Sequence, residues 1–240
     1  MSDSGLGQEM GLVDRVVYRF CWSMLWLALK AWFRFRVVGK EHLPKVEPYI
    51  LAPVHRSYLD TPVGGMATSR RLRFLGKESL WNSRFAGRFL TIVGGFPVER
   101  GTADRAALRA CQEVLERGEP MVMFPEGTRR HGPVVLAEEM HAGPAFVAVR
   151  AGVPIVPMGI AGTDHAMPGG SALIRPTKVF LVVGEPIRPP VLDGRVPRRV
   201  VEELTEELRR QMQVVFDEAQ RLAGRPALSR PALPEPLDGD

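Results

Sequence analysis

The stretch Tyr49-Ile-Leu-Ala-Pro-Val-His-Arg-Ser-Tyr-Leu-Asp60 changes from apolar to polar residues, and the sequence becomes mostly apolar again just beyond it. It opens with a short apolar run that ends at Pro53, continues through polar residues, and leads into a mostly apolar segment that reaches Thr68. A short apolar run closed by proline is typical of a buried strand, because proline cannot donate a hydrogen bond to the sheet. We therefore predict a strand, a turn over residues 54–57 and then a helix.

Similar transitions recur along the chain. Short apolar runs alternate with amphipathic stretches, which predicts an α/β fold with a mostly parallel or mixed sheet flanked by helices. The clearest helices are expected at 102–117, with Thr102 as N-cap, and at about 197–222, where apolar residues recur every three or four positions. Pro154 and Pro157 are expected at a sheet edge or near a bulge. The predicted strands are 49–52, 72–75, 96–98, 121–124, 154–160 and 178–183.

Length and composition limit the number of domains and the class of partner. With 240 residues, 45% of them hydrophobic, the chain is long enough for one well-filled core. Its net charge of +5 suits an anionic partner such as a phospholipid surface, a phosphorylated substrate or nucleic acid. No nucleic-acid reader motif is present, so we expect no nucleic-acid partner. Cys21 and Cys111 lack the spacing of a metal or redox site, so we expect no metal ion.

The N-terminal segment 1–36 combines aromatic and basic residues and holds three of the four tryptophans. Its uncharged run, 20–29, is shorter than the roughly 20 apolar residues that a spanning helix needs. Tryptophans with flanking cations are typical of a helix pair on a membrane surface. The alternative is a buried helix that caps the sheet. Residues 37–224 are predicted to form the α/β domain, and the proline-rich residues 225–240 a disordered tail.

His55 and Asp60 are the first candidates for chemistry. In a continuous helix, residues five apart point about 140° away from each other, so the two side chains would not meet. They meet only if His55 lies in the turn after the strand. A carboxylate beside an imidazole fixes its tautomer, which a general base requires. The alternative is a hydrogen-bonded surface pair without catalytic function.

A second polar group follows the predicted strand at 121–124. The sequence Phe124-Pro-Glu-Gly-Thr-Arg-Arg130 places a carboxylate, a glycine and two guanidinium groups where the strand ends. Ligand sites of α/β sheets lie outside these ends, so a phosphate could be held by Arg129 and by N–H groups near Gly127. The alternative is a polar turn in which Glu126 and Arg129 pair with each other.

A third group, Gly94-Gly-Phe-Pro-Val-Glu-Arg100-Gly101, brings an arginine to the predicted start of the 102–117 helix. The N-terminus of a helix favours a bound anion, so Arg100 is a further candidate for phosphate binding.

Together these motifs resemble the glycerolipid acyltransferase family, in particular the bacterial 1-acylglycerol-3-phosphate acyltransferases. The resemblance rests on a histidine and an aspartate separated by four residues (His55, Asp60) and on Gly94, Phe96 and Arg100. It also rests on the block 124–129 and on the proline-containing run 153–157, and it covers roughly residues 35–190. Lys77 resembles a lysine that follows the second strand in this family. One departure is local: Met140-His-Ala-Gly143 stands where many relatives carry lysines.

The resemblance implies roles for these residues. His55 would act as the general base and Asp60 would orient it, without an acyl-enzyme intermediate. The acceptor's phosphate or glycerol head would be held by a binding set comprising Lys77, Arg100, Glu126, Gly127, Thr128 and Arg129. No cofactor is implied, because acyl-CoA or acyl carrier protein is a substrate.

The implied reaction converts a lysophospholipid acceptor, 1-acylglycerol-3-phosphate, to phosphatidic acid in phospholipid biosynthesis. The expected location is the cytoplasmic face of the cell membrane, as a peripheral or monotopic protein. Other acceptors remain open, namely another lysophospholipid, glycerol-3-phosphate or a glycolipid. An alternative of another class is a peripheral lipid-binding protein without turnover.

Overall fold

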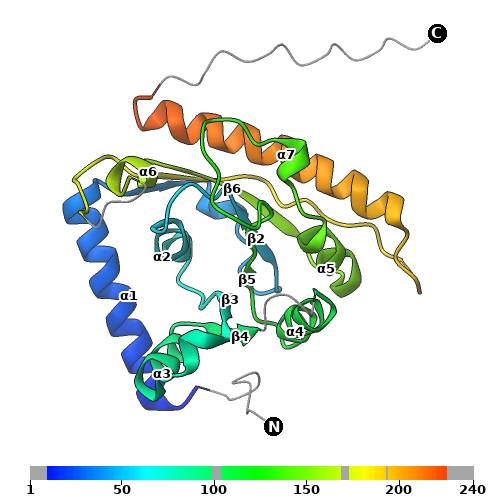
Figure 1. Cartoon of the computed structure of the whole chain (residues 1–240), viewed down its shortest axis with the longest axis horizontal. Coiled ribbons are helices and arrows are strands. Elements are labelled where there is room, and N and C mark those ends of the chain that lie inside the picture. Colours follow the sequence, from blue (N-terminus) through cyan, green and yellow to red (C-terminus); the bar gives the residue numbers. More distant parts are fainter. Residues whose placement is uncertain (1–9, 99–103, 169–172, 193, 226–240) are drawn as a thin grey trace.

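The computed structural model of the chain describes residues 10–98, 104–168, 173–192 and 194–225. Within these ranges the chain folds as a sheet with helices on both faces (Figure 1). The strands are β1 (Arg36–Val38), β2 (Ile50–Pro53), β3 (Arg73–Lys77), β4 (Gly95–Val98), β5 (Met121–Val122), β6 (Ile155–Ala161) and β7 (Phe180–Val183). The α-helices are α1 (Leu12–Phe33), α2 (Asp60–Gly64), α3 (Arg84–Ile92), α4 (Asp104–Glu116), α5 (Gly143–Ala151), α6 (Thr163–Ala166) and α7 (Arg198–Leu222). The short 3₁₀ turns are η1 (Lys40–His42), η2 (Gly65–Ala67), η3 (Glu78–Trp81) and η4 (Ala137–Glu139).

The sheet is mixed, as the sequence predicts. Its strand order is β1-β7-β6-β2-β5-β3-β4. The five strands from β6 to β4 are parallel, β7 runs antiparallel to β6, and β1 is parallel to β7. The predicted strands are found, with β5 shorter than expected, whereas β1 was not predicted.

The connections wind in two directions from the middle of the sheet. From β2 the chain passes through α2 and α3 to β3 and β4, and then returns through α4 and α5 to β5 and β6. In Figure 1, α1, α2 and α3 lie on one side of the strands, and α4, α5 and α7 lie on the other. The neighbouring strands β2 and β5 are therefore followed by helices on opposite faces. In open α/β sheets this divergence leaves a crevice at the carboxyl ends of the two strands, where ligands bind.

Helix α7 confirms the predicted C-terminal helix and its apolar face. It packs across β6 and β7. A Cβ at Gly159 of β6 would lie 2.2 Å from the carbonyl oxygen of Val215, so only glycine allows the helix to approach this closely. The buried residues of the helix are Val201, Leu204, Leu208, Met212, Val215, Phe216 and Ala219.

Pro157 lies inside the sheet, where the pairing shifts by one residue. Met158 pairs with Val183, whereas Ile155 pairs with Ile187, so two residues of β6 face three residues on the other chain segment. This irregularity is a bulge. The expectation of a proline near a bulge is therefore confirmed, and the missing N–H of Pro157 falls where the regular ladder is interrupted.

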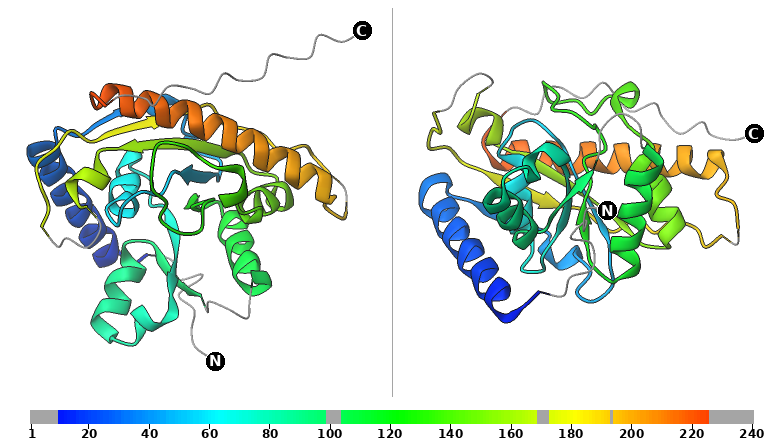
Figure 2. Two further views of the ribbon diagram at one scale, coloured as in Figure 1. Left: turned by 45° about the horizontal axis from the view of Figure 1, so that its top comes forward. Right: turned by 60° about the horizontal axis from the view of Figure 1, so that its bottom comes forward.

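The N-terminal segment differs from the expected pair of helices. Its described part forms one helix, α1, which ends at Phe33 and is followed by Arg34 in the left-handed region (φ 48°). Leu29 and Phe33 of α1 are buried in the core, and β1 begins three residues after the helix ends. Both views of Figure 2 place α1 along the outside of the domain. None of the described helices combines the length and apolar character that crossing a bilayer requires.

Among the predicted secondary-structure features, two fall outside the described residues wholly or in part. Thr102, the predicted N-cap of α4, precedes the described part of that helix, and the predicted tail is described only at Arg225.

Candidate active site

The turn that follows β2 has the predicted form. The strand ends at Pro53, and the N–H of Val54 still donates to the carbonyl oxygen of Met158 in β6 (3.0 Å). The chain then turns away from the sheet, and α2 begins at Asp60. His55 therefore lies in a turn, which is the condition for contact with Asp60.

The imidazole of His55 and the carboxylate of Asp60 are in hydrogen-bond contact. The distance from His55 Nδ1 to Asp60 Oδ2 is 3.1 Å. The same oxygen accepts the N–H groups of Arg56 (2.5 Å) and Ser57 (2.6 Å), and Oδ1 accepts the hydroxyl of Thr163 (2.6 Å). Asp60 is fully buried. Because both oxygens are held, the carboxylate is fixed in place and in turn fixes the imidazole.

The contact with Asp60 determines which ring nitrogen of His55 can take a proton. An ionised carboxylate only accepts hydrogen bonds, so Nδ1 carries the hydrogen and Nε2 presents its lone pair. Within the described part of the chain, nothing hydrogen-bonds to Nε2. The ring packs on Phe124, with 4.1 Å between the ring centroids, and 15% of the side chain is exposed. Nε2 can therefore accept a proton from a bound molecule.

Glu126 and Arg56 form a buried ion pair behind His55. Both oxygens of Glu126 accept from one nitrogen of the Arg56 guanidinium, at 2.7 and 2.8 Å, and one of them also accepts the N–H of His55 at 2.7 Å. The guanidinium further donates to the carbonyl oxygens of Gly132 (2.9 Å) and Val134 (3.2 Å). This network joins the loop after β5 to the loop after β2.

The surroundings of Glu126 differ from those expected of a residue that contacts the acceptor. The sequence predicts contact with the acceptor, but Glu126 is fully buried and its carboxylate is occupied by Arg56 and by the His55 amide. This geometry favours a positioning role, and contact of Glu126 with the acceptor stays a prediction. It also excludes the alternative in which Glu126 pairs with Arg129, since its partner is Arg56.

Gly127 and Thr128 shape the turn that carries Arg129. Gly127 has a φ of 65°, and a Cβ there would lie 2.6 Å from the ring of His141, so glycine is required on both grounds. The N–H of Gly127 donates to the carbonyl oxygen of Phe124 (3.0 Å), and the N–H of Thr128 donates to the backbone carbonyl oxygen of Glu126 (2.6 Å). These two N–H groups are used within the turn, whereas the sequence assigned them to a bound anion.

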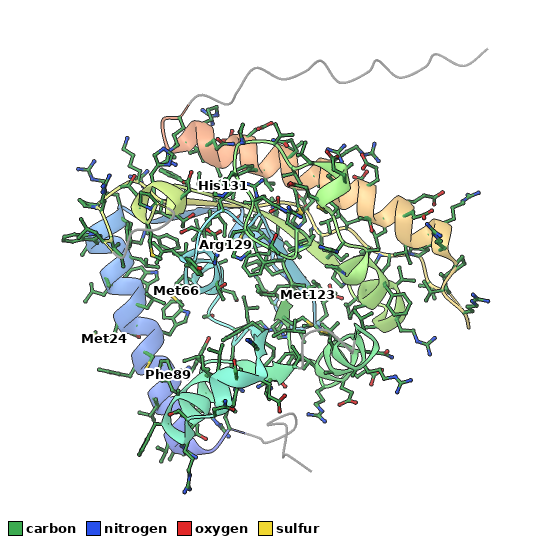
Figure 3. The ribbon with its side chains drawn as sticks, viewed as in Figure 1. Met24, Met66, Phe89, Met123, Arg129 and His131 are labelled. Carbon is green, nitrogen blue, oxygen red and sulfur yellow. The ribbon has the colours of Figure 1, made fainter. Side chains whose placement is uncertain are left out.

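Arg129 faces solvent at the mouth of the site. Its guanidinium carbon lies 3.3 Å from the ring centroid of Tyr58, which belongs to the His55 turn. No described residue pairs with the N–H groups at the guanidinium edge, so they can form a fork with an anion while the ring face stacks on Tyr58. In Figure 3, Arg129 lies over the middle of the fold, near α2 and the strand ends. The neighbouring Arg130 is instead paired with Glu139, at 3.2 Å.

Lys77 ends β3 at the same edge of the sheet. It is exposed and pairs in register with Val98, the last residue of β4. Arg100 lies outside the described residues, two positions beyond Val98. The strand pairing brings the end of the described β4 beside Lys77, and Arg100 follows from there in sequence.

Sequence reasoning missed Arg56 and Thr163. Arg56 is buried, and nothing in the local sequence distinguishes it from an exposed arginine. Thr163 follows β6, whose carboxyl end lies beside that of β2. Thr163 could have been found from the sequence, because it is a polar residue just after a strand that was predicted in the sheet.

An apolar cavity of about 420 Å³ opens beside α2. Thr61 and Pro62, which directly follow Asp60, form part of its wall. The volume falls within the range of roughly 300–1,000 Å³ that is usual for small-molecule sites. The remaining wall comes from α1, η2, α3 and the sheet: Tyr18, Cys21, Trp22, Leu25, Gly65, Met66, Leu72, Phe74, Phe89, Leu90, Val93 and Val122.

Comparison with known proteins agrees with this arrangement. A family model described as Acyltransferase matches residues 34–161, more than half of the chain. A 1-acyl-sn-glycerol-3-phosphate acyltransferase of Bacillus subtilis is 27% identical over 71% of this chain and 82% of its own length. A protein of that name from Chlamydomonas reinhardtii is 29% identical, but only 48% of its length is covered. The crystal structure of the Thermotoga maritima 1-acyl-sn-glycerophosphate acyltransferase has a TM-score of 0.68 at 27% identity and covers 95% of this chain and 87% of that one. This chain therefore belongs to the Acyltransferase family.

Proposed function

We propose that this chain transfers a fatty acyl group from acyl-CoA or acyl carrier protein to the free hydroxyl of 1-acylglycerol-3-phosphate, giving phosphatidic acid for phospholipid biosynthesis. The observation that carries the proposal is Nε2 of His55, to which no described residue hydrogen-bonds and which the buried Asp60 holds in orientation. The names of the relatives support the choice of acceptor.

The proposed chemistry is a direct transfer. His55 Nε2 takes the hydroxyl proton of the acceptor while the hydroxyl oxygen attacks the thioester carbonyl. The C–S bond then breaks, and the thiolate leaves with the proton from the imidazolium. Asp60 stabilises the imidazolium between these two steps. A base positioned in this way contributes typically about 10² to 10⁴ in rate.

The cations at the sheet edge support a phosphate-bearing acceptor. Arg129 presents its guanidinium edge outward from its stack on Tyr58, and Lys77 is exposed at the end of β3. We assign the phosphate to Arg129, with Arg100 and Lys77 as further ligands. The apolar cavity beside Asp60 supports a long acyl chain as part of a substrate, because its wall is built from apolar side chains of four helices and the sheet.

The outer face of α1 supports work at a membrane surface. Val16, Phe20 and Leu27 are exposed by 60%, 64% and 55%. Large apolar side chains gathered on one helix face are typical of interaction with a membrane or partner. We propose that α1 holds the protein on the cytoplasmic face of the membrane, where the acyl donors are found.

The membrane proposal needs a test that leaves the core intact. Deleting residues 1–36 would also remove Leu29 and Phe33, which are buried. The double substitution Phe20→Ser/Leu27→Ser changes only exposed positions of α1. It should release the protein from phospholipid vesicles while the melting temperature stays the same. Unchanged co-sedimentation with the vesicles would contradict the proposal.

Activity is tested with a panel of acceptors and both donor types. We expect mass analysis to find phosphatidic acid when labelled acyl-CoA or acyl carrier protein is supplied with 1-acylglycerol-3-phosphate. His55→Ala should abolish product, whereas the matched change His165→Ala, at an exposed histidine, should not. If product forms only from another lysophospholipid, from glycerol-3-phosphate or from a glycolipid, that molecule is the acceptor and 1-acylglycerol-3-phosphate is not. If the folded protein cleaves the thioester with none of the acceptors, the result would indicate lipid binding without turnover.

A further inference from the structure

A second hollow, of about 510 Å³, lies between α1 and the segments that lead into β2 and β3. We call it the lysine groove. Lys30 of α1 lines one side, and Lys40 and Lys45, which precede β2, line another. Trp22 and Trp26 of α1 complete the aromatic part of its wall. Met66, labelled in Figure 3 beside α1, belongs to the wall that the groove shares with the apolar cavity.

The charge of the lysine groove is not compensated. Three of the five lysines of the chain line it, although cations elsewhere in the sequence are mostly arginines. No carboxylate belongs to its described wall, and none of the three lysines has an ion pair with a described residue. Arg70, the fourth cation, is occupied, since it donates to the carbonyl oxygens of Pro44, Glu47 and Gly118. The lysines are therefore free to bind an anion.

Trp22 and Trp26 are held in place by contacts with their neighbours. Trp22 donates its indole N–H to the carbonyl oxygen of Thr68 (3.2 Å), and its ring stacks on Trp26 with 6.5 Å between centroids. The ammonium of Lys30 lies 5.4 Å from the Trp26 ring centroid. A fixed indole with a cation over its face is a suitable neighbour for a phosphate at a membrane interface, where tryptophan is enriched.

The distribution of charge around α1 places the lysine groove beside the apolar outer face. At 100° per residue, Arg15, Arg19 and Lys30 all lie within about 80° of Trp22, on the groove side. The acidic Asp14 lies on the opposite flank, where it binds an arginine of α3 at 3.0 Å.

The exposed side chains of Val16, Leu27 and Phe20 project from α1 at roughly 120° to 160° from Trp22, measured around the helix axis. With this face in the hydrocarbon, the lysine groove would open at the level of the headgroups.

We propose that the lysine groove binds the phosphate of an anionic phospholipid of the bilayer, at a site separate from the catalytic one. Lys40 and Lys45 lie before the start of β2, whereas His55 lies beyond its other end. The bound lipid would place its chains along the apolar face of α1 and thereby fix the orientation of the enzyme on the surface. The inference rests on the proposed function only in requiring that the protein works at a membrane.

The test compares two variants with the same loss of charge. The first is Lys30→Gln/Lys40→Gln/Lys45→Gln, and the control is Arg195→Gln/Arg198→Gln/Arg199→Gln, at exposed positions around the start of α7. Co-sedimentation is measured with phosphatidylcholine vesicles that contain phosphatidylglycerol, and with vesicles that lack it. We expect the lysine variant to bind the anionic vesicles about 100-fold more weakly, a factor of about five per lysine. The control should lose far less, and both should bind neutral vesicles like the unmodified protein.

Three outcomes would overturn the inference. One is an equal loss of vesicle binding in both variants, which would mean that only net charge matters. Another is found by calorimetry without vesicles: free coenzyme A binds to the unmodified protein and to the control but not to the lysine variant. The groove would then be a binding site for the acyl donor. The third is competition by soluble glycerol phosphate for the anionic vesicles, which would mean that the chains are not needed. Acyl transfer to a water-soluble short-chain acceptor is measured in parallel. If transfer is absent while the vesicle difference holds, the proposed function fails and the groove assignment stands.

Discussion

The loop of His55 and the outer face of α7 both concentrate charge, but they do so in opposite environments. Around this loop, Asp60 at the start of α2 and Glu126 in the loop after β5 are fully buried, and hydrogen bonds reach both oxygens of each carboxylate. On α7, arginines pair with glutamates three or four residues away, as in Arg198–Glu202 at 2.6 Å, where the side chains are 91% and 57% exposed. The distances are similar, so burial is what distinguishes the two regions.

Burial changes what each ion pair contributes to stability. Removing one partner of a buried pair leaves an uncompensated charge and costs about 3–5 kcal/mol. An exposed pair contributes only about 0.2–1 kcal/mol, because water and salt screen it. The five short Arg–Glu pairs of α7 are therefore expected to matter less for folding than the single Arg56–Glu126 pair. The first prediction concerns the rate of the reaction, and the other three compare stabilities.

The largest effect is expected for Asp60→Asn. The amide keeps the shape of the carboxylate but carries no charge to orient and stabilise the imidazolium of His55. The turnover number should fall by about 10² to 10⁴, measured with saturating acyl donor and acceptor. The circular dichroism spectrum should remain that of the folded protein. A turnover number within about threefold of the original would show that Asp60 only supports the turn.

Glu126→Gln should destabilise the fold by about 3–5 kcal/mol, because Arg56 then keeps its charge in a buried site without a counter-charge. Urea unfolding measures the change in free energy. The double variant Arg56→Met/Glu126→Gln removes both charges, so its loss should be smaller than the sum of the single losses, by a coupling of more than about 1 kcal/mol. Additive losses would mean that the pair does not act as a unit.

These residues also mark the limit of what the sequence predicts. The turn after β2 and the His55–Asp60 contact followed from local rules, because proline ends a strand and residues five apart cannot meet in a helix. The strand alternation likewise gave the α/β class. The role of Glu126 did not follow, since its residue type suits both an exposed ligand site and a buried pair.

Long-range packing explains the remaining differences. Arg56 is buried because Phe216 of α7, far along the chain, lies 5.0 Å from its guanidinium carbon. Strand β1 was missed because its three residues carry little pattern and are fixed by pairing with β7. The composition of α1 predicts a helix on a membrane surface. Its exposed apolar face is compatible with this location, which stays a prediction.

Thr163→Val tests a smaller part of the buried network. Valine has nearly the same shape but cannot donate to Asp60, which Thr163 does at 2.6 Å. A hydrogen bond to a charged group contributes about 1.5–3 kcal/mol, so unfolding should become easier by about that amount. Thr163→Ser keeps the hydroxyl and should restore most of the loss. Equal stability of the valine and serine variants would show that packing, not the hydroxyl, is what matters at this position.

The smallest effect is expected for Glu206→Gln on α7, the same chemical change as at Glu126 but at an exposed site. A hydrogen bond from Arg209 lowers the pKa of Glu206 below its usual value. The pair therefore adds stability above the unfolded-state pKa of glutamate, and this contribution is lost as the pH falls through the lower folded-state pKa. At neutral pH the substitution should cost less than about 0.5 kcal/mol of unfolding free energy, and the cost should shrink in high salt. A loss above about 1 kcal/mol that persists in high salt would break the comparison, because an exposed pair would then behave like the buried one.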